Sequence, residues 1–439
     1  MDLLISFLLF LSGIVVCMVG GFALNYALLF GFFIFFGLGV SRGNSVKAVW
    51  NMAVQGAMSS MVVVRILLLL GCLTALWRSS GTIAFFVFWG IELSTPQTFI
   101  LIAFLLPALL CLTFGSSFGV SGTAGVILMA IAQSGGANLV MTAGAALSGA
   151  YFGERLSPAS SVLSLTANAC GADLATSQRM MWKSTYIPLA LTLIFYGVLS
   201  ANNPIASVDP EIPNALASSF ALSPLLALPA IVLLVLPWFH IKAFWTIVAS
   251  CVTTAALAIF LQGATLLDIL HDCVFGFSFD HPILGSIMQG GGLLSMTSII
   301  TIVLLSTAYC GIFSATHMLD GVKHQIEKLA EKIGLFPVLC LMGLGTPALF
   351  CNQSVSIVMS VEMTKELYHK QGFTPEDQAV HVGNSVINLS GLVPWAISCS
   401  VPLANMGADI ASLPYSIYLY LVPICFGLSK ASKLPSPTK

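Results

Sequence analysis

The stretch CLTFGSSFGVSGTAGV, from Cys111 to Val126, interrupts a long apolar region with four glycines and several hydroxyl side chains. This density of glycine and serine favours a broken helix. In a bilayer, unpaired backbone groups are tolerated only inside protein or beside a water-filled cavity. Broken helices at membrane depth are typical of transporter binding sites. Close helix packing through small residues is the alternative explanation, and this stretch alone does not separate the two.

The composition indicates a membrane protein. Of the 439 residues, 57% are hydrophobic and 8% are charged, whereas a soluble domain carries about 25% charged residues. Several charge-poor stretches reach the length that a spanning helix needs. We therefore expect an all-α polytopic membrane protein with about ten to twelve transmembrane helices, some of them broken or re-entrant.

Charge and cysteine usage argue against several other classes of protein. A net charge of −1 gives no basic footprint for nucleic acid. The eleven cysteines include no CxxC pair, and most lie in apolar runs, so we expect neither a metal site nor a disulfide framework, and no cofactor. Asp2 stands where a signal peptide would be basic, so no cleavable signal is expected.

A second interrupted helix lies far downstream, in GLGTPALFCNQSVSIV, Gly343 to Val358. Interrupted segments at corresponding places in two halves are the usual sequence trace of an inverted-repeat transporter. We therefore predict two membrane repeats. The first comprises residues 1–200 with a break near 115–125, and the second comprises residues 201–439 with a break near 345–356.

Neutral oxygen-bearing side chains gather at the two breaks and in the apolar segment 379–395. Amide and hydroxyl oxygens, together with unwound carbonyls, suit Na⁺, although hydrogen bonding between helices would also explain them. Asn384 and Asn388 are expected on one helical face, four residues apart. The candidates for binding the solute or the ion are Ser116, Ser117, Thr123, Asn352, Gln353, Ser354, Asn384, Ser385 and Asn388, with Ser117 and Asn352 as expected Na⁺ ligands.

Few ionisable side chains remain at membrane depth. Arg65 is the clearest, while Glu154, Arg155 and Asp173 lie near predicted helix ends. A charge inside the membrane is a functional candidate by default, so Glu154 and Asp173 are candidate titrating groups. The alternatives are an interfacial Glu154–Arg155 pair that snorkels to the surface, and a helix-capping role for Asp173.

The distribution of basic residues predicts the orientation in the membrane. The polar segments 201–218 and 268–282 contain no lysine or arginine, whereas the segment 317–332 carries several lysines. Lysine and arginine mark the cytoplasmic side. We therefore expect the first two segments outside the cytoplasm, and expect Lys242, the segment 317–332 and the lysine-bearing tail inside it.

The residues Gly115 to Gly119 also match G-x-S-x-G, the nucleophile elbow of serine hydrolases. That motif needs a preceding strand, a following helix, and histidine and aspartate partners. Here it lies in a predicted membrane helix, and all seven histidines lie in or near predicted loops. We therefore predict a transporter and not an enzyme, with an intramembrane hydrolase or a passive channel as weaker alternatives.

Five pieces of the sequence resemble the NhaC-type Na⁺/H⁺ antiporter family. They are RILLLLGCLTALWRSSGTI from Arg65, FGSSFGVSGTAGV from Phe114, SGAYFGERLSP from Ser148, QSVSIV from Gln353 and LVPWA from Leu392. The resemblance implies a dimer with two inverted repeats and re-entrant hairpins. It also implies exchange of Na⁺ for protons or, as in relatives, transport of malate with lactate or of amino acids.

The resemblance also shows where this chain departs from the family. Ser157 keeps the family's Ser-Pro, but Ser161 replaces the acid that follows, and both join the candidate site residues. Asn352 and the Gly383-Asn384 pair likewise stand where the family carries acids. Amides and hydroxyls do not titrate near neutral pH, so these positions do not carry protons.

Together these features predict a secondary transporter in a bacterial inner membrane. It is expected to move a small organic solute, an amino acid or a carboxylate, coupled to Na⁺ or H⁺. A Na⁺/H⁺ antiporter proper, with Glu154 or Asp173 as the titrating group, is the alternative. The expected partners are the solute, the ion, the lipid bilayer and a second copy of the chain, but not nucleic acid.

Overall fold

The computed structural model describes residues 2–429, except 21, 94–96, 159, 205–210, 240, 242, 282–283 and 317–319. In this part of the chain the secondary structure is helical, and its only β contact is an isolated bridge between Phe277 and Gly290. The predicted all-α fold is confirmed. The predicted cytoplasmic position of Lys242 and of the tail lies outside the described residues.

The helices fall into two series along the chain. The first series is α1 (Asp2–Gly20), α2 (Leu24–Ser41), α3 (Val46–Ser59), α4 (Met61–Ser79), α5 (Thr82–Leu93), α6 (Phe99–Phe114), α7 (Ser117–Val120), the π-helical η1 (Ser121–Gly125), α8 (Val126–Ser134), α9 (Leu139–Leu156), α10 (Ser161–Cys170) and α11 (Leu174–Asn202). The second series is α12 (Glu211–Ser219), η2 (Pro224–Ala227), α13 (Leu228–Val235), η3 (Leu236–Phe239), α14 (Ala243–Gln262), α15 (Leu266–Phe275), α16 (Gly285–Met288), η4 (Leu293–Met296), α17 (Thr297–Ala315), α18 (Asp320–Ile333), α19 (Leu335–Phe350), α20 (Gln353–Lys370), α21 (Pro375–Asn384), α22 (Val386–Ser390), α23 (Ile397–Asn405), η5 (Ile410–Tyr415) and α24 (Ile417–Leu428).

Only some of these helices are long enough to cross a bilayer alone. Four described segments are long and apolar enough to cross a membrane, namely Ser117–Ser134, Leu174–Asn202, Phe244–Gln262 and Leu293–Phe313. The number rises to six if each of two bent helix pairs counts as one span. Other apolar helices, α6 and α19 among them, have 10–17 residues. The expected ten to twelve spans stay a prediction, which would require helices that are too short to cross by themselves.

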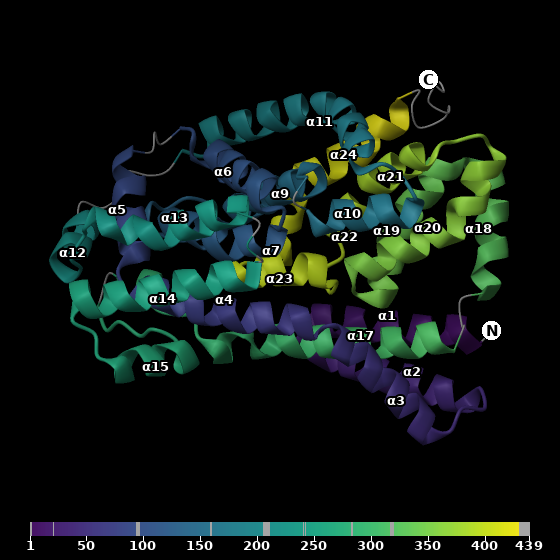
Figure 1. Cartoon of the computed structure of the whole chain (residues 1–439), viewed down its shortest axis with the longest axis horizontal. Coiled ribbons are helices and arrows are strands. Elements are labelled where there is room, and N and C mark those ends of the chain that lie inside the picture. Colours follow the sequence, from purple (N-terminus) through teal and green to yellow (C-terminus); the bar gives the residue numbers. More distant parts are fainter. Residues whose placement is uncertain are drawn as a thin grey trace.

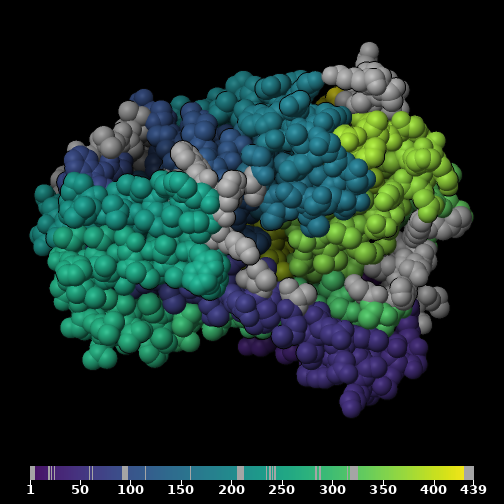
Figure 2. Space-filling view, viewed as in Figure 1, coloured from purple at the N-terminus to yellow at the C-terminus, as the bar shows by residue number. Residues whose placement is uncertain are grey.

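The helices form an elongated bundle (Figure 1). The long helix α11 runs along one side of it, and α1 and α17 run along the opposite side. Helices α12 to α14 gather in one lobe and α18 to α20 in another (Figure 2). Helix α9 lies between these groups and is buried almost along its whole length, from Thr142 to Leu156.

Three glycines explain how α9 packs so closely. A Cβ on Gly149 would lie 2.2 Å from the Phe104 carbonyl oxygen of α6, and a Cβ on Gly153 would lie 2.4 Å from the Cys111 Cβ. On another side of α9, a Cβ on Gly144 would lie 2.5 Å from the carbonyl oxygen of Ser412. Small residues on facing helices let backbones approach in this way.

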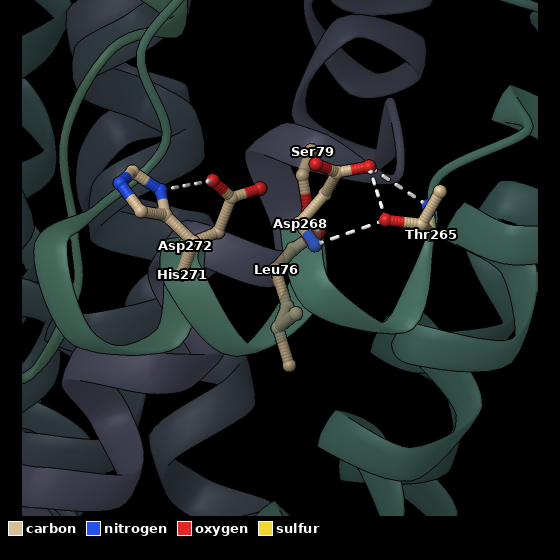
Figure 3. A network of polar contacts seen from close by, with 6 residues as sticks. All are labelled: Leu76, Ser79, Thr265, Asp268, His271 and Asp272. Atoms are coloured by element: carbon tan, nitrogen blue, oxygen red, sulfur yellow. Dashed lines mark hydrogen bonds and ion pairs between the residues drawn. The ribbon is translucent and has the colours of Figure 1, made fainter.

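Helix α15 packs on the end of α4 (Figure 3). It makes residues 268–275 of the predicted outer segment 268–282 helical. Thr265 and Asp268 cap α15 reciprocally, since each side chain accepts a hydrogen bond from the other residue's backbone N–H. Ile269 packs with Leu76 of α4. Burial raises the pKa of the neighbouring Asp272 carboxyl, which lies 3.6 Å from His271 Nδ1.

The close packing of α6 and α9 predicts that Gly149→Val lowers stability. The added side chain has no room beside the Phe104 carbonyl, and overpacking of this kind costs about 1–3 kcal/mol. Thermal unfolding of the purified protein in detergent measures the effect. The matched control is Gly197→Ala in α11, where nothing lies within 4 Å of the added Cβ. An unchanged melting temperature for Gly149→Val would contradict this packing.

Helices α12 and α15 lie at one end of the bundle and α18 lies at the other (Figure 1). The lysine distribution predicts that these two ends lie on opposite sides of the membrane, which a labelling experiment can test. In a cysteine-free background, a cysteine at exposed Ser218 in α12 should react with an impermeant thiol reagent added outside. A cysteine at exposed Lys332 in α18 should react only after the membrane is opened. The reverse result would invert the orientation.

Candidate functional site

The first break is confined to two residues. Helix α6 ends at Gly115, whose φ of 68° is left-handed, and Ser116 follows in extended conformation. The Ser116 hydroxyl accepts a hydrogen bond from the Gly119 N–H and so caps α7. The rest of the glycine-rich stretch continues as helix through the π-helical turn to Ser134. The break predicted near 115–125 is therefore much shorter than expected.

Gly122 and Gly125 of this stretch serve close packing, the alternative that the sequence left open. A Cβ on Gly122 would meet Leu70 of α4 at 3.1 Å, and a Cβ on Gly125 would meet Met406 at 2.7 Å. The π-helical segment between them widens the helix locally, a feature often found at functional sites. Both explanations of the stretch therefore apply, each to different residues.

The second break repeats the geometry of the first. Helix α19 ends at Cys351, which is also left-handed with a φ of 53°, and Asn352 follows in extended conformation. The Asn352 Oδ1 accepts hydrogen bonds from the N–H groups of Ser354 and Val355 and so caps α20. Each break thus consists of a left-handed residue, an extended capping residue and a new helix.

The first residues after the two breaks face the same carboxyl group. Glu154 on α9 is 4% exposed, and its Oε1 accepts hydrogen bonds from the Ser117 N–H at 3.1 Å and from the Ser117 hydroxyl at 2.7 Å. The Gln353 side chain, at the start of α20, lies close to this carboxyl and donates to the Ile387 carbonyl oxygen at 3.2 Å. The other oxygen, Oε2, has no hydrogen-bond partner among the described residues.

Arg155, the next residue on α9, is fully buried and points to other helices. It donates hydrogen bonds to Asn384 Oδ1 of α21, to the Thr185 hydroxyl of α11 and, at 2.7 Å, to the Tyr418 hydroxyl of α24. Its guanidinium also lies over the Tyr418 ring, 5.7 Å from the centroid. These three acceptors are neutral, and no described carboxylate forms an ion pair with Arg155.

The structure rules out one interpretation of the charged residues. Glu154 and Arg155 are not an interfacial pair, because both are buried, and successive helical residues point about 100° apart toward different neighbours. Arg65, predicted to be the clearest ionisable residue at membrane depth, is exposed on the bundle near the start of α4, and its depth in the membrane stays a prediction. Hydropathy along the sequence shows where a helix ends, but not which helices surround that end.

The predicted shared face of Asn384 and Asn388 is also wrong. The chain breaks at Ser385, with φ −120° and ψ −79°, so the two residues lie on separate helices, α21 and α22. Asn388 donates to the carbonyl oxygen of Gly383 at 2.8 Å, which satisfies a backbone group near the break, and Ser385 donates to the carbonyl oxygen of His381. The predicted span over 379–395 is therefore interrupted.

The other predicted site residues are not gathered around one ion. Ser116 and Asn352, the second an expected Na⁺ ligand, use their side-chain oxygens to cap their own helices, and Thr123 bonds to the Gly119 carbonyl within its helix. Ser157 is buried at the end of α9. Two of the candidates, Ser161 and Ser354, are exposed. Ser117, Gln353, Asn384, Ser385 and Asn388 are the predicted residues that are buried around the breaks.

Asp173 behaves as a helix cap. Its carboxylate accepts a hydrogen bond from the Thr176 N–H at the start of α11, and its side chain is exposed. Hydrogen bonding by Thr176 and the nearby Arg179 lower the pKa of Asp173. This carboxyl is therefore ionised at neutral pH and lies on the surface, which leaves Glu154 as the buried candidate for titration.

Sequence reasoning missed His381. This residue is buried in α21, with its Nδ1 2.7 Å from the Tyr368 hydroxyl and the rings of Phe336, Phe373 and Phe426 around it. The prediction that all histidines lie in or near loops is wrong for this one. The sequence signal that could have indicated its burial is its position one turn before Asn384, in a helix that is weakly polar but buried.

The serine hydrolase alternative fails on the local structure. Ser117 begins a helix that follows another helix, whereas the nucleophile elbow needs a strand before the serine. Its hydroxyl donates to Glu154. Among the described residues, no group of three or more His, Cys, Asp or Glu side chains is arranged to hold a metal ion.

Comparisons with known proteins agree with this architecture. The model of the Na⁺/H⁺ antiporter family matches residues 149–428. The chain is 24% identical over 416 residues to the malate-2H⁺/Na⁺-lactate antiporter of Bacillus subtilis, covering 92% of this chain and 88% of that protein. It is 25% identical over 402 residues to the Na⁺/H⁺ antiporter NhaC of Alkalihalophilus pseudofirmus, covering 88% and 86%.

A third relative is named as an amino acid antiporter. The arginine/ornithine antiporter ArcD of Halobacterium salinarum is 27% identical over 390 residues, covering 85% of this chain and 80% of that protein. The family match covers more than half of the chain, and the relatives match over most of their length. The chain therefore belongs to the Na⁺/H⁺ antiporter family and is a secondary transporter of the NhaC type.

Proposed function

We propose that this transporter couples a cation, Na⁺ or H⁺, bound at Glu154 to the movement of a small organic solute that carries a carboxylate. The observation that carries the proposal is the state of Glu154. It is a buried carboxyl with one oxygen bound to Ser117, and no arginine or lysine is paired with it among the described residues. A buried carboxylate without a counterion is too costly to persist, so a proton or a metal cation must neutralise it.

The two breaks support Glu154 as the cation site. Ser117 and Gln353 are the first residues of α7 and α20, so the amino ends of two helices approach one carboxyl group. Carboxylate, hydroxyl and amide oxygens are the ligand types that hard cations prefer.

This assignment changes the role expected for the neutral residues. The oxygens of Asn352 and Asn384 are already engaged, by backbone N–H groups and by Arg155 respectively. Asn352 therefore stabilises the second break, and Asn384 helps to hold α9. Glu154 supplies the titrating group that a Na⁺/H⁺ antiporter would need. Exchange of Na⁺ for H⁺ alone remains the second candidate, because it needs the same carboxyl and no solute.

The likeness to relatives named for malate and lactate and for arginine and ornithine supports a solute that carries a carboxylate. The division into two inverted repeats, residues 1–200 and 201–439, is supported by the matched geometry of the two breaks and stays a prediction. The bacterial inner membrane, the homodimer and the absence of a catalytic role belong to this same proposal.

The cation assignment predicts that Glu154→Gln impairs ion coupling. The change keeps the shape of the side chain but removes its charge, and loss of a charged contact weakens Na⁺ binding about 10- to 100-fold. The measurement is transport in proteoliposomes with Na⁺ and pH gradients imposed separately. We expect Glu154→Gln to abolish the response to both gradients, and Ser117→Ala to weaken it less.

The matched control is Asp173→Asn. Because Asp173 is exposed, and its lowered pKa keeps it ionised near neutral pH, this change should leave transport and its pH dependence intact. If Asp173→Asn abolished coupling while Glu154→Gln did not, the cation site would lie elsewhere. If a pH gradient drove Na⁺ exchange and no solute ever altered it, the second candidate would stand.

A further inference from the structure

A cavity of about 550 Å³ lies between α4, α17, α23 and α8, the last of which continues the helix that follows the first break. Helices α4, α17 and α23 run close together in this part of the bundle (Figure 1). Its volume is in the range of pockets for small molecules, which is roughly 300–1,000 Å³. Glu154 is not among the residues that line it. The cavity is therefore a place for a second, larger ligand.

Arg78 supplies a cation to this cavity. It lies near the end of α4, partly buried, and its Nη1 donates to the Thr74 carbonyl oxygen of the same helix at 2.9 Å. Its Nε has no hydrogen-bond partner in the described part of the chain, and no described carboxylate is within ion-pair distance. A guanidinium carries five N–H donors in a planar fork that fits a carboxylate.

The loop after α16 lies next to the guanidinium. A Cβ on Gly290 would lie 3.8 Å from the Arg78 Cζ, so this loop passes directly over the group. Gly291, with a φ of 80°, lies so close to α4 that an added Cβ would be 2.4 Å from the Ala75 nitrogen. Only glycine fits there, and the loop therefore forms a close wall beside Arg78.

Asn405 supplies an unfilled acceptor. It is 9% exposed, and its Nδ2 donates to the Phe118 carbonyl oxygen at 3.3 Å and to the Ser121 hydroxyl at 3.2 Å. These bonds fix the amide against the helix that follows the first break. Asn405 lines the same cavity as Arg78, and its Oδ1 is buried without a partner among the described residues.

Much of the remaining lining is apolar, with Met129, Ile299, Ile302 and Leu403. The charged residues of the lining are Arg78 and the exposed Asp409. The cavity thus offers a donor fork, a separate acceptor and an apolar wall. A complementary ligand carries a carboxylate, a hydrogen-bond donor next to it and a short apolar side chain.

We propose that this cavity binds a 2-amino or 2-hydroxy acid with an apolar side chain. Its carboxylate pairs with Arg78, and its amino or hydroxyl group donates to Asn405 Oδ1. This inference rests on the proposed function, since it names the class of solute that the transporter carries. Asn405 also joins the two sites, because it binds the same short helix whose first residue, Ser117, bonds to Glu154.

Four probes of one carbon skeleton test the proposal by thermal stability of the purified protein. L-Leucine and L-2-hydroxyisocaproate carry both groups, 4-methylpentanoate lacks the neighbouring donor, and L-leucinamide lacks the carboxylate. At about 10 mM, a ligand with a millimolar Kd stabilises measurably by mass action. We expect leucine or 2-hydroxyisocaproate to raise the melting temperature most, 4-methylpentanoate less and leucinamide not at all. The stronger of the first two identifies the amino or the hydroxy acid.

Variants locate the binding. Arg78→Gln should weaken binding of the stronger acid about 10- to 100-fold. The control Arg65→Gln changes an exposed arginine on the same helix, about 20 Å away along its axis, and should leave binding unchanged. Asn405→Ala should reduce binding of the stronger acid to the level of 4-methylpentanoate. The Asn405→Ala variant therefore still tests binding at this cavity if Arg78→Gln does not fold.

The results that would overturn the proposal are specific. Equal stabilisation by leucinamide, no stabilisation by any of the acids, or equal losses in Arg65→Gln and Arg78→Gln would each contradict it. Glu154→Gln separates it from the cation site. If the acids bind through Arg78 but Na⁺ and pH act normally in Glu154→Gln, only the cation assignment is wrong. If Na⁺ and pH effects require Glu154 but no acid binds through Arg78, only the solute site is wrong.

Discussion

Two opposite charges stand side by side on one buried helix and do not neutralise each other. Removing an ion from water costs several kcal/mol even after the protein relaxes. Here the cost is offset by different helices for each charge, by α7 for Glu154 and by α11, α21 and α24 for Arg155. The position of α9 therefore depends on segments from both halves of the chain. The glycines that let α9 approach α6 complete this arrangement.

Each of the two charged groups keeps one buried atom without a described partner, Oε2 of Glu154 and Nε of Arg155, but the two groups differ in the helices that they bind. The terminal nitrogens of Arg155 bond to three neutral side chains, so Arg155 holds helices together. Glu154 keeps one oxygen without a protein partner in the described structure, so it remains open to a proton or a cation. Arg78 and Asn405 repeat the pattern in the neighbouring cavity, each with one group bound and another left over.

The all-helical class, the two breaks and several polar residues around them could be predicted from the sequence, because apolar runs and glycine–hydroxyl clusters are local signals. The exact break points could not. Cys351 is not a glycine, and the residue at the interruption between α21 and α22, Ser385, is neither glycine nor proline. Glu154 and Arg155 were misplaced for a similar reason, since burial of a helix end depends on helices far away in the sequence. Arg78 lay within a recognised motif but gave no local sign of the cavity.

The left-handed Cys351 gives the two breaks different stiffness. Glycine adopts a positive φ freely at Gly115, whereas an L residue in this conformation costs roughly 1–2 kcal/mol. The Cys351 sulfur also lies 2.6 Å from the Tyr309 hydroxyl. In a cysteine-free version of the chain, the residue that replaces Cys351 therefore affects the second break. Alanine would keep the backbone strain and lose the contact, while glycine would lose both and make the second hinge as compliant as the first.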